Sequence, residues 1–131
     1  MAHRSRLAVV VIDTEQTRRE AGVSFWTGAL GRDRQGDDEP AARYVHLKTP
    51  TGPTLDVVVQ ATSPDHAGVH LDIETDDVEA EVKRLEKLGA RRVRFVDEWW
   101  VMEAPSGHRF CVIPIQTDTW PEGALEWPTE G

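Results

Sequence analysis

One strand, turn and strand unit occurs twice in this chain, and this repetition restricts the fold more than any single motif. The tripeptides Pro50-Thr51-Gly52 and Pro105-Ser106-Gly107 each precede an apolar run that is typical of a strand. Upstream of each unit, a helix-like stretch ends at a Leu-Gly pair and follows another apolar run, at 7–12 and at 69–73. Both halves therefore predict a strand, a helix and then further strands.

The length of the chain determines how the halves combine. With 131 residues, the chain suits one domain with a real core and is too short for two independent domains. We therefore predict a single domain over 1–131 whose two halves share one core. Repeat 1 spans about 6–61, repeat 2 spans about 69–115, and a tryptophan-rich tail covers 116–131.

Charge and cysteine content exclude several classes of partner. A formal net charge of -8, with basic residues scattered among acidic ones, argues against binding to nucleic acid or to an anionic membrane. The single cysteine excludes an internal disulfide and a CxxC zinc motif. The first apolar run is interrupted at Asp13, which makes it too short for a signal peptide or a membrane span. We expect a cytoplasmic protein.

The first half begins with a β-branched run at 7–12 that favours a buried strand. Thr17 and Glu20 have the spacing of a capping box, so we expect a helix to begin there and to end at Gly31. The acidic run at 37–39 predicts a solvated loop. Strands are expected at 43–48 and 54–60, and the linker between the halves at 61–68.

The second half contains the clearest helix. Asp76 and Glu79 form a predicted capping pair, apolar residues follow at helical spacing, and Gly89 ends the stretch. Strands are expected around 93–95, at 99–102 and at 109–115. The tail from 117 onward has no periodicity, but Trp120 and Trp127 favour packing across the body of the protein over disorder, with a partner-binding segment as the alternative.

These features resemble the vicinal oxygen chelate superfamily, and more narrowly its glyoxalase-like branch, which includes bleomycin-resistance proteins. The resemblance covers roughly residues 6 to 115. It rests on the order of elements, on His70-Leu71-Asp72-Ile73 before the helix start at Asp76-Asp77-Val78, and on the segment at 100–112 with its Pro-x-Gly turn. Phe25-Trp26 in the first helix also fits the family.

The resemblance implies an α+β fold of two βαβββ modules whose mixed sheets curve around a cleft. Small members of the family usually form homodimers. In many family enzymes, side chains from the first and last strands of the modules hold a divalent metal, which polarises vicinal oxygen atoms of a substrate.

At the positions that match the family's metal ligands, this sequence has a different set of residues. His70 matches the histidine of the second module's first strand, and alternation places Asp72 on the same face. The usual last-strand glutamate corresponds to Cys111, and Asp56 occupies the equivalent position in the first repeat. The first strand, at 7–12, offers no ligand.

Two outcomes remain open for this set. His70, Asp56 and Cys111 could form a three-ligand site for zinc or a similar divalent metal. Alternatively, no metal binds: Cys111 is then a small buried hydrophobe, His70 a hydrogen-bonded pocket or core residue, and Asp56 an exposed or dimer-edge carboxylate. The sequence favours the second outcome.

Further residues are candidates for substrate contacts. Asp72 and Cys111 could face the cleft, His46 could either face it or be exposed to solvent, and Trp26 and Trp100 could supply an apolar lining. For the two tryptophans, packing in the core or at a dimer interface is the alternative.

Three functions are compatible with these residues. The first is a glyoxalase-like enzyme, a lyase, an isomerase or a dioxygenase relative, which acts on a small oxygenated metabolite with His70 as acid or base and Asp56 or Asp72 as orienting carboxylate. The second is a homodimer of the bleomycin-resistance type that sequesters a drug or antibiotic. The third is a structural or regulatory dimer. A shared scaffold does not decide between them.

Overall fold

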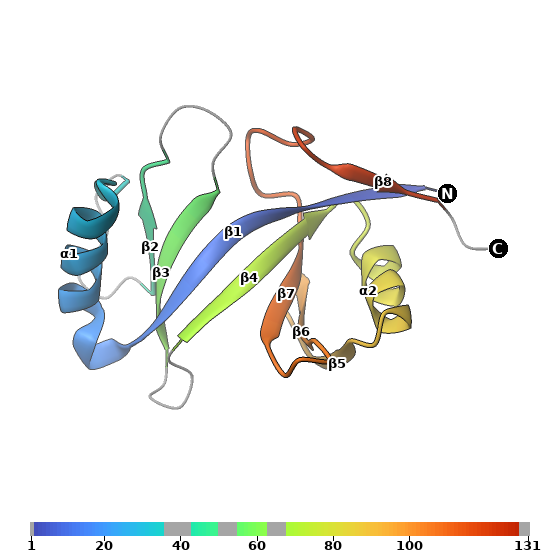
Figure 1. Cartoon of the computed structure of the whole chain (residues 1–131), viewed down its shortest axis with the longest axis horizontal. Helices are drawn as coiled ribbons and strands as arrows, with labels where there is room; N and C mark the ends of the chain where they lie inside the picture. Colours follow the sequence, from blue (N-terminus) through green and yellow to red (C-terminus); the bar gives the residue numbers. More distant parts are fainter. Residues whose placement is uncertain (1, 36–42, 50–54, 63–67, 129–131) are drawn as a thin grey trace. The chain divides into compact units, whose positions relative to one another are not determined.

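A computed structural model describes residues 2–35, 43–49, 55–62 and 68–128 (Figure 1). The chain divides into two compact units, one formed by residues 9–70 and the other by residues 1–8 together with 71–131. The first unit corresponds to repeat 1. The second contains repeat 2 and both ends of the chain.

The 9–70 unit carries a helix on one face of a small sheet. Strand β1 (His3–Glu15) leads through a 3-10 turn, η1 (Gln16–Arg18), into α1 (Arg19–Leu30), and β2 (Tyr44–Leu47) and β3 (Asp56–Thr62) follow. Strand β3 lies between β1, to which it is parallel, and β2, to which it is antiparallel. An isolated bridge between Arg34 and Leu47 extends the sheet beyond β2.

The core of this unit lies between α1 and the sheet. It contains the buried residues Val23, Val45, Leu47 and Val59, with Trp26 packed against them. Because strand side chains alternate, the residues between these positions project from the opposite face of the sheet.

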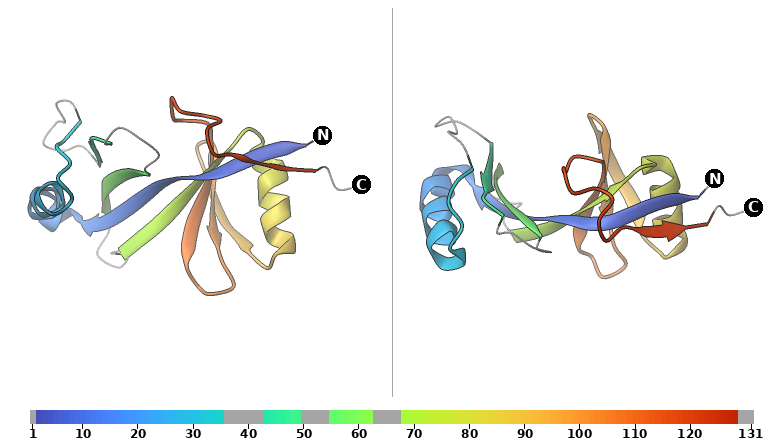
Figure 2. Two further views of the ribbon diagram at one scale, coloured as in Figure 1. Left: turned by 45° about the horizontal axis from the view of Figure 1, so that its top comes forward. Right: turned by 90° about the horizontal axis from the view of Figure 1, so that it is seen from above.

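The second unit repeats this plan with one additional strand among the described residues. Strand β4 (Gly68–Thr75) is followed by α2 (Val78–Lys87), β5 (Arg91–Val96), β6 (Trp99–Glu103) and β7 (Arg109–Pro114). The strand order is β4-β7-β6-β5, with β4 parallel to β7 and the other pairs antiparallel. Val82 of α2 packs on Met102 and Val112, so α2 covers one face of these strands (Figure 2). The predicted α+β fold, with the strand, helix and strands order in both halves, is confirmed.

Both helices begin later than their sequence patterns predicted. Helix α1 begins at Arg19 without a side-chain cap, because the Thr17 hydroxyl donates a hydrogen bond to Glu15 instead. The cap of α2 is Asp77, whose carboxylate accepts a hydrogen bond from the backbone of Ala80 at 3.0 Å. The neighbouring carboxylate of Asp76 is paired with Arg4, so it serves the N-terminal strand rather than the helix.

The second Pro-x-Gly turn joins β6 to β7 and touches the end of α2. Gly107 has a φ of 90°, and its backbone donates to the carbonyl of Ala104 at 2.8 Å. Gly89 follows α2 with a φ of 109°, and a Cβ atom there would lie 2.9 Å from Cγ of Pro105. The turn at 50–52, the acidic run at 37–39 and most of the linker lie outside the described residues.

The C-terminal segment packs on its own unit, as its tryptophans predicted. Strand β8 (Leu125–Trp127) pairs antiparallel with the start of β1. The indole nitrogen of Trp127 donates to Ser5 at 2.9 Å, and the guanidinium of Arg84 stacks 3.8 Å from the centre of a Trp127 ring. Within the part of the chain that the structure describes, no helix is long and apolar enough to cross a membrane.

Candidate functional site

Asp13 and His70 form the central pair of the candidate site in the 9–70 unit. Nδ1 of His70 lies 2.6 Å from Oδ2 of Asp13, and the two side chains are only 17% and 11% exposed. A carboxylate can only accept hydrogen bonds, so Nδ1 of His70 carries a proton in this pairing. The pair therefore has the orientation that a carboxylate imposes on a catalytic histidine.

Gln60 extends this pair into a short chain of polar groups. It is the register partner of Asp13 on β3, so both side chains share the face opposite α1. With its amide turned to satisfy both neighbours, Gln60 donates to Asp13 at 3.0 Å and accepts from the Arg43 guanidinium at 3.2 Å. The amide of Gln60 thus links the Arg43 guanidinium to the Asp13 carboxylate.

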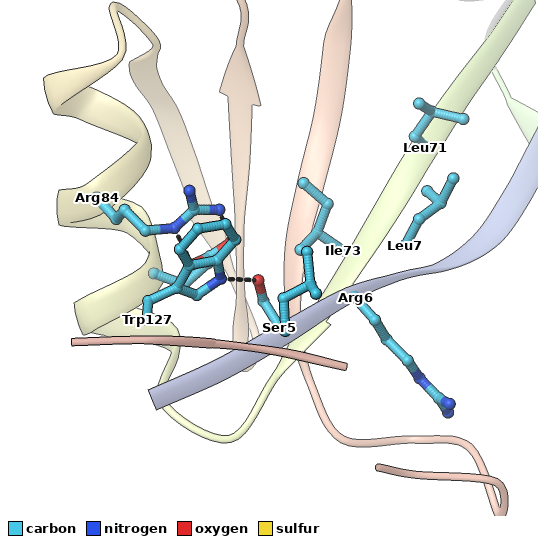
Figure 3. A pocket seen from close by; sticks show the side chains of 9 residues that line it. Ser5, Arg6, Leu7, Leu71, Ile73, Arg84 and Trp127 are labelled. Carbon is cyan, nitrogen blue, oxygen red and sulfur yellow. Dashed lines mark hydrogen bonds and ion pairs between the residues drawn. The ribbon is translucent and has the colours of Figure 1, made fainter. Parts of the chain in front are cut away.

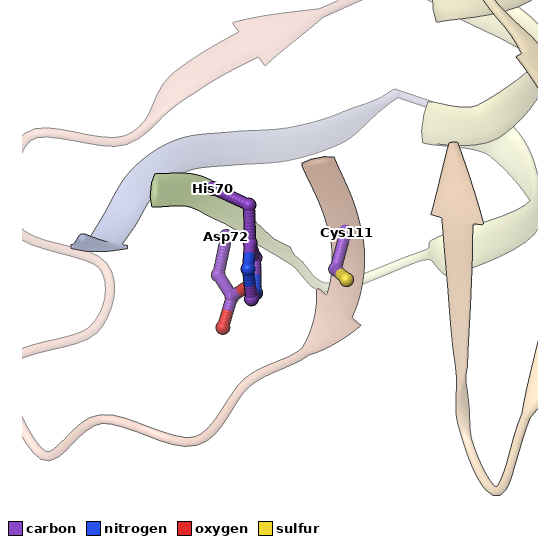
Figure 4. Close-up of side chains that lie close together, drawn as sticks. All are labelled: His70, Asp72 and Cys111. Atoms are coloured by element: carbon purple, nitrogen blue, oxygen red, sulfur yellow. The ribbon is translucent and has the colours of Figure 1, made fainter. Parts of the chain in front are cut away.

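A second group of polar side chains lies on β4 and β7. Asp72 and Cys111 are register partners on these parallel strands. His70 precedes Asp72 by two residues on β4, so alternation puts its side chain on the same face (Figure 4). Possible ligand atoms of the three side chains lie within 4.8 Å of one another. Imidazole, carboxylate and thiolate together are a donor set that suits zinc.

Asp56 lies elsewhere in the 9–70 unit. It is the register partner of Val9, four residues along β1 from Asp13, and this separation is about 13 Å in a strand. Its carboxylate accepts a hydrogen bond from the hydroxyl of Thr49. Among the described residues, Asp56 belongs to no group of possible metal ligands. The carboxylate that lies near His70 and Cys111 is therefore Asp72, where the sequence predicted Asp56, and metal binding itself stays a prediction.

The other predicted contacts fall on two different faces. His46 is exposed and shares the register of Val58, which places it on the face opposite α1. Trp26 packs against the core beneath α1, and Trp100 packs against the core beneath α2. Both indoles are partly buried in these contacts, and their role in lining a binding cleft stays a prediction.

Asp13 is the site residue that the sequence did not reveal. The β-branched run ends at Ile12, which predicted the end of the strand, but β1 continues to Glu15. A single acidic residue just after an apolar run was the only available signal. Because a charge that is largely buried needs a partner, such a residue is informative when it continues a strand.

A separate groove of about 280 Å³ lies beside α2 in the other unit (Figure 3). Its lining includes the apolar side chains of Leu71, Ile73 and Trp127, together with the carboxylate of Glu81. Burial raises the pKa of the Glu81 carboxyl, but hydrogen bonds from Arg84, His3 and Ser5 together outweigh it and hold this pKa below its ordinary value. Glu81 is therefore ionised, and it pairs with Arg84 of α2 and with His3 near the N-terminus.

Comparison with solved structures supports the fold described above. A hypothetical protein, BH1468 from Bacillus halodurans C-125, is 14% identical with a TM-score of 0.62, over 88% of this chain and 97% of that one. A glyoxalase/bleomycin resistance protein/dioxygenase superfamily member from Vibrio splendidus 12B01 is 16% identical with a TM-score of 0.55. The match covers 85% of this chain and 99% of that one. At these identities the similarity shows the fold alone.

A larger enzyme shares the same fold over part of its length. Homoprotocatechuate 2,3-dioxygenase from Brevibacterium fuscum, in complex with 3,4-dihydroxyphenylacetate, is 17% identical with a TM-score of 0.57. The match covers 86% of this chain and 37% of the dioxygenase. No curated protein matches the sequence significantly.

The sequence itself matches a protein family over most of its length. The family described as the glyoxalase-like domain matches residues 9–113, from β1 to the last strand of the second repeat. The chain therefore belongs to the glyoxalase-like domain family, within the vicinal oxygen chelate superfamily.

Proposed function

We propose that this protein is an enzyme that removes a proton from a small oxygenated metabolite, with His70 as the general base. The observation that carries the proposal is the 2.6 Å pair between His70 and the largely buried Asp13. The ligand of the dioxygenase described above is a small oxygenated molecule, which agrees with this class of substrate.

The chemistry follows from the protonation of the imidazole. With Nδ1–H donating to Asp13, Nε2 accepts the substrate proton, and the carboxylate stabilises the resulting imidazolium. Asp13 fixes the orientation and tautomer of the ring and does not itself receive the proton. Gln60 donates a hydrogen bond to the other oxygen of the Asp13 carboxylate and accepts one from Arg43, so it helps to hold this carboxylate in position.

A divalent metal fits the neighbouring donor set. His70, Asp72 and Cys111 would hold it, and zinc is the metal that these donors suit best. Such an ion, when bound, supplies Lewis-acid polarisation of a substrate oxygen. Asp13 would then orient a ligand histidine instead of a base, which is a common arrangement around metal-bound imidazole.

Hydrogen–deuterium exchange tests the proposed proton transfer without knowledge of the final product. The purified protein is incubated in D₂O with a panel of small aldehydes, ketones and 2-hydroxy ketones, and loss of the proton beside the carbonyl is followed by ¹H NMR. We expect catalysed exchange with at least one compound, and a loss of about 10²-fold or more in a His70→Gln variant. A panel without exchange contradicts the proposal.

Metal analysis separates the two roles of His70. The protein is stripped with a chelator, its metal content is measured by mass spectrometry, and exchange is measured before and after zinc is restored. Proton exchange that persists in the metal-free protein supports the role of His70 as the general base. Exchange that requires one equivalent of zinc, and that disappears in a Cys111→Ser variant, supports the metal role instead.

Two further outcomes bear on the other functions that the sequence left open. Ligands that raise the melting temperature but undergo no exchange would favour a binding protein. Association into a homodimer also stays a prediction, which sedimentation of the wild-type chain at several concentrations tests directly.

A further inference from the structure

A β-bulge in the edge strand β5 changes the face on which Arg94 lies. Arg92 is opposite Met102 and Arg94 is opposite Val101, so the intervening Val93 is an extra residue in the ladder. Without this bulge, Arg94 would share the α2-covered face with Arg92. Bulges of this kind occur next to active sites, where they redirect a side chain.

The bulge puts Arg94 in one row with the reactive residues of its unit. Val101 is the register partner of both Arg94 and Cys111, and Cys111 is the partner of Asp72. The row therefore crosses β5, β6, β7 and β4 on the face opposite α2. Arg94 and Cys111 are two strands apart, or about 10 Å between backbones. An extended arginine and a small metabolite together span such a gap.

Besides Arg94, this face carries two further arginines together with the carboxylates of Asp72 and Glu103. Arg91 and Arg109 lie one row away, and both donate hydrogen bonds to the same carboxylate, Glu103, at 3.0 and 3.3 Å. Their hydrogen bonds, with that from Arg91 contributing most, hold the pKa of Glu103 below its ordinary value. Within the described residues, Arg94 is exposed and makes no ion pair or hydrogen bond through its side chain.

We propose that Arg94 binds the carboxylate of an anionic substrate, whose oxygenated end lies over Cys111 and Asp72. The substrate class is a small keto carboxylate. A planar guanidinium holds a carboxylate through two parallel hydrogen bonds, so it selects against neutral compounds of the same size. The position of the reacting group in this inference rests on the proposed function. The anion site itself depends only on residues of the second unit, which comprises residues 1–8 and 71–131.

A pair of matched probes tests the charge requirement. The first is 4-oxopentanoate, and the second is 5-hydroxypentan-2-one, in which a neutral CH₂OH replaces the carboxylate. Binding is measured by NMR titration of ¹⁵N-labelled protein, with the arginine Nε–H signals as reporters. We expect saturable binding of the anion that shifts the Arg94 signal, and binding at least about tenfold weaker for the neutral probe.

The Arg94→Gln variant is expected to bind the anion about tenfold more weakly, with no change for the neutral probe. Arg92→Gln is the matched control, because it removes the same charge from the same strand but on the other face. Equal weakening in both variants would show a net-charge effect and overturn the inference. Absence of saturable 4-oxopentanoate binding to the wild-type chain also overturns it.

The His70→Gln variant distinguishes this inference from the proposed function. If His70 is the base, this variant loses proton exchange but still binds 4-oxopentanoate through Arg94. Anion binding that depends on Arg94, in a wild-type protein that catalyses no exchange, would sustain the anion site and contradict the proposed proton transfer.

Discussion

Nδ1 of His70 lies 2.6 Å from Oδ2 of Asp13, although 57 positions separate the two residues in the chain. The pair joins the first residues of one strand to the end of another, within the same compact unit. The geometry of this pair suits both roles that we propose for His70, a general base or a metal ligand whose ring is oriented by Asp13.

Replacing Asp13 by Asn tests whether the carboxylate sets the tautomer of His70. The amide can donate a hydrogen bond to Nδ1, which would leave the proton on Nε2 and remove the base. We expect proton exchange to fall by about 10²-fold or more while the melting temperature changes little. An Asp13→Glu variant, which keeps the charge, should retain more activity than Asp13→Asn. Equal activities would show that Asp13 has only a packing role.

The buried Glu81 should make the stability of the protein depend on acid pH. Its pKa is lowered in the folded state from an ordinary value of 4.5, so the folded state binds fewer protons than the unfolded state. The stabilisation is therefore complete above pH 4.5 and is lost as the pH falls through the lowered pKa. We expect Glu81→Gln to reduce the free energy of unfolding by about 3 kcal/mol at pH 7.

Urea unfolding at several pH values checks this expectation. The difference between the wild type and Glu81→Gln should shrink as the pH falls below 4.5, because the wild-type carboxyl is then also neutral. A difference that is constant with pH would mean that the substitution acts through packing and not through ionisation.

The guanidinium of Arg6 connects strand β1 to strand β4 and to the C-terminal segment. It pairs with the fully buried Glu74 at 2.6 Å and donates hydrogen bonds to Thr119 and to the carbonyl of Glu122. Arg6→Met would leave a buried carboxylate without its cation, so we expect a loss of about 3 kcal/mol in the free energy of unfolding. The exposed Arg18 provides the control, since Arg18→Met should change stability by less than about 0.5 kcal/mol.

A double-mutant cycle decides whether the pair itself is responsible. If the Arg6–Glu74 contact accounts for the loss, Arg6→Met should cost much less in a Glu74→Gln background than in the wild type. If the losses in the free energy of unfolding from the two single substitutions simply add in the double variant, the effect of Arg6→Met comes from the contacts of Arg6 with the C-terminal segment.

Two glycines provide a matched test of backbone and packing constraints. Gly89 has a φ of 109°, and a Cβ atom would lie 2.9 Å from Pro105, so Gly89→Ala should destabilise the protein by about 1–3 kcal/mol. Gly28 lies within α1 with no atom near its Cβ position. Gly28→Ala should stabilise the helix by up to about 1 kcal/mol. Thermal unfolding of both variants measures the contrast, and a shift of the same sign in both would contradict it.

The sequence predicted the fold well because its signals are local. Periodicity, Gly stops and the duplicated Pro-x-Gly turns each depend on neighbouring residues, and these patterns correctly identified both helices and the order of strands. Both helix starts were predicted one residue too early, because Thr17 and Asp76 have partners outside the helix. Strand β8 was missed because three residues have no periodicity, and it exists only through pairing with β1.

The candidate site was predicted only in part, for a physical reason. Alternation within one strand was enough to put His70 and Asp72 on a common face, and the turn spacing identified Cys111. Asp56 was chosen because the repeats align it with Cys111, but equivalence between repeats does not bring two residues together. Asp13 could not be paired with His70 from the sequence, because no local rule links the end of one strand to the start of another.

The sequence by itself thus determined the repeat, the family and the ionisable residues available on β4 and β7. The tertiary structure decided which side chains lie together, namely Asp13 with His70 and Asp72 with Cys111. It also decided that Arg94 lies on the face opposite α2. Strand register and a single bulge made these choices, because a shift of one residue reverses the face of every side chain that follows. The sequence specifies the identity of each side chain, whereas hydrogen bonds between strands determine the face of the sheet on which it lies and the residue that it contacts.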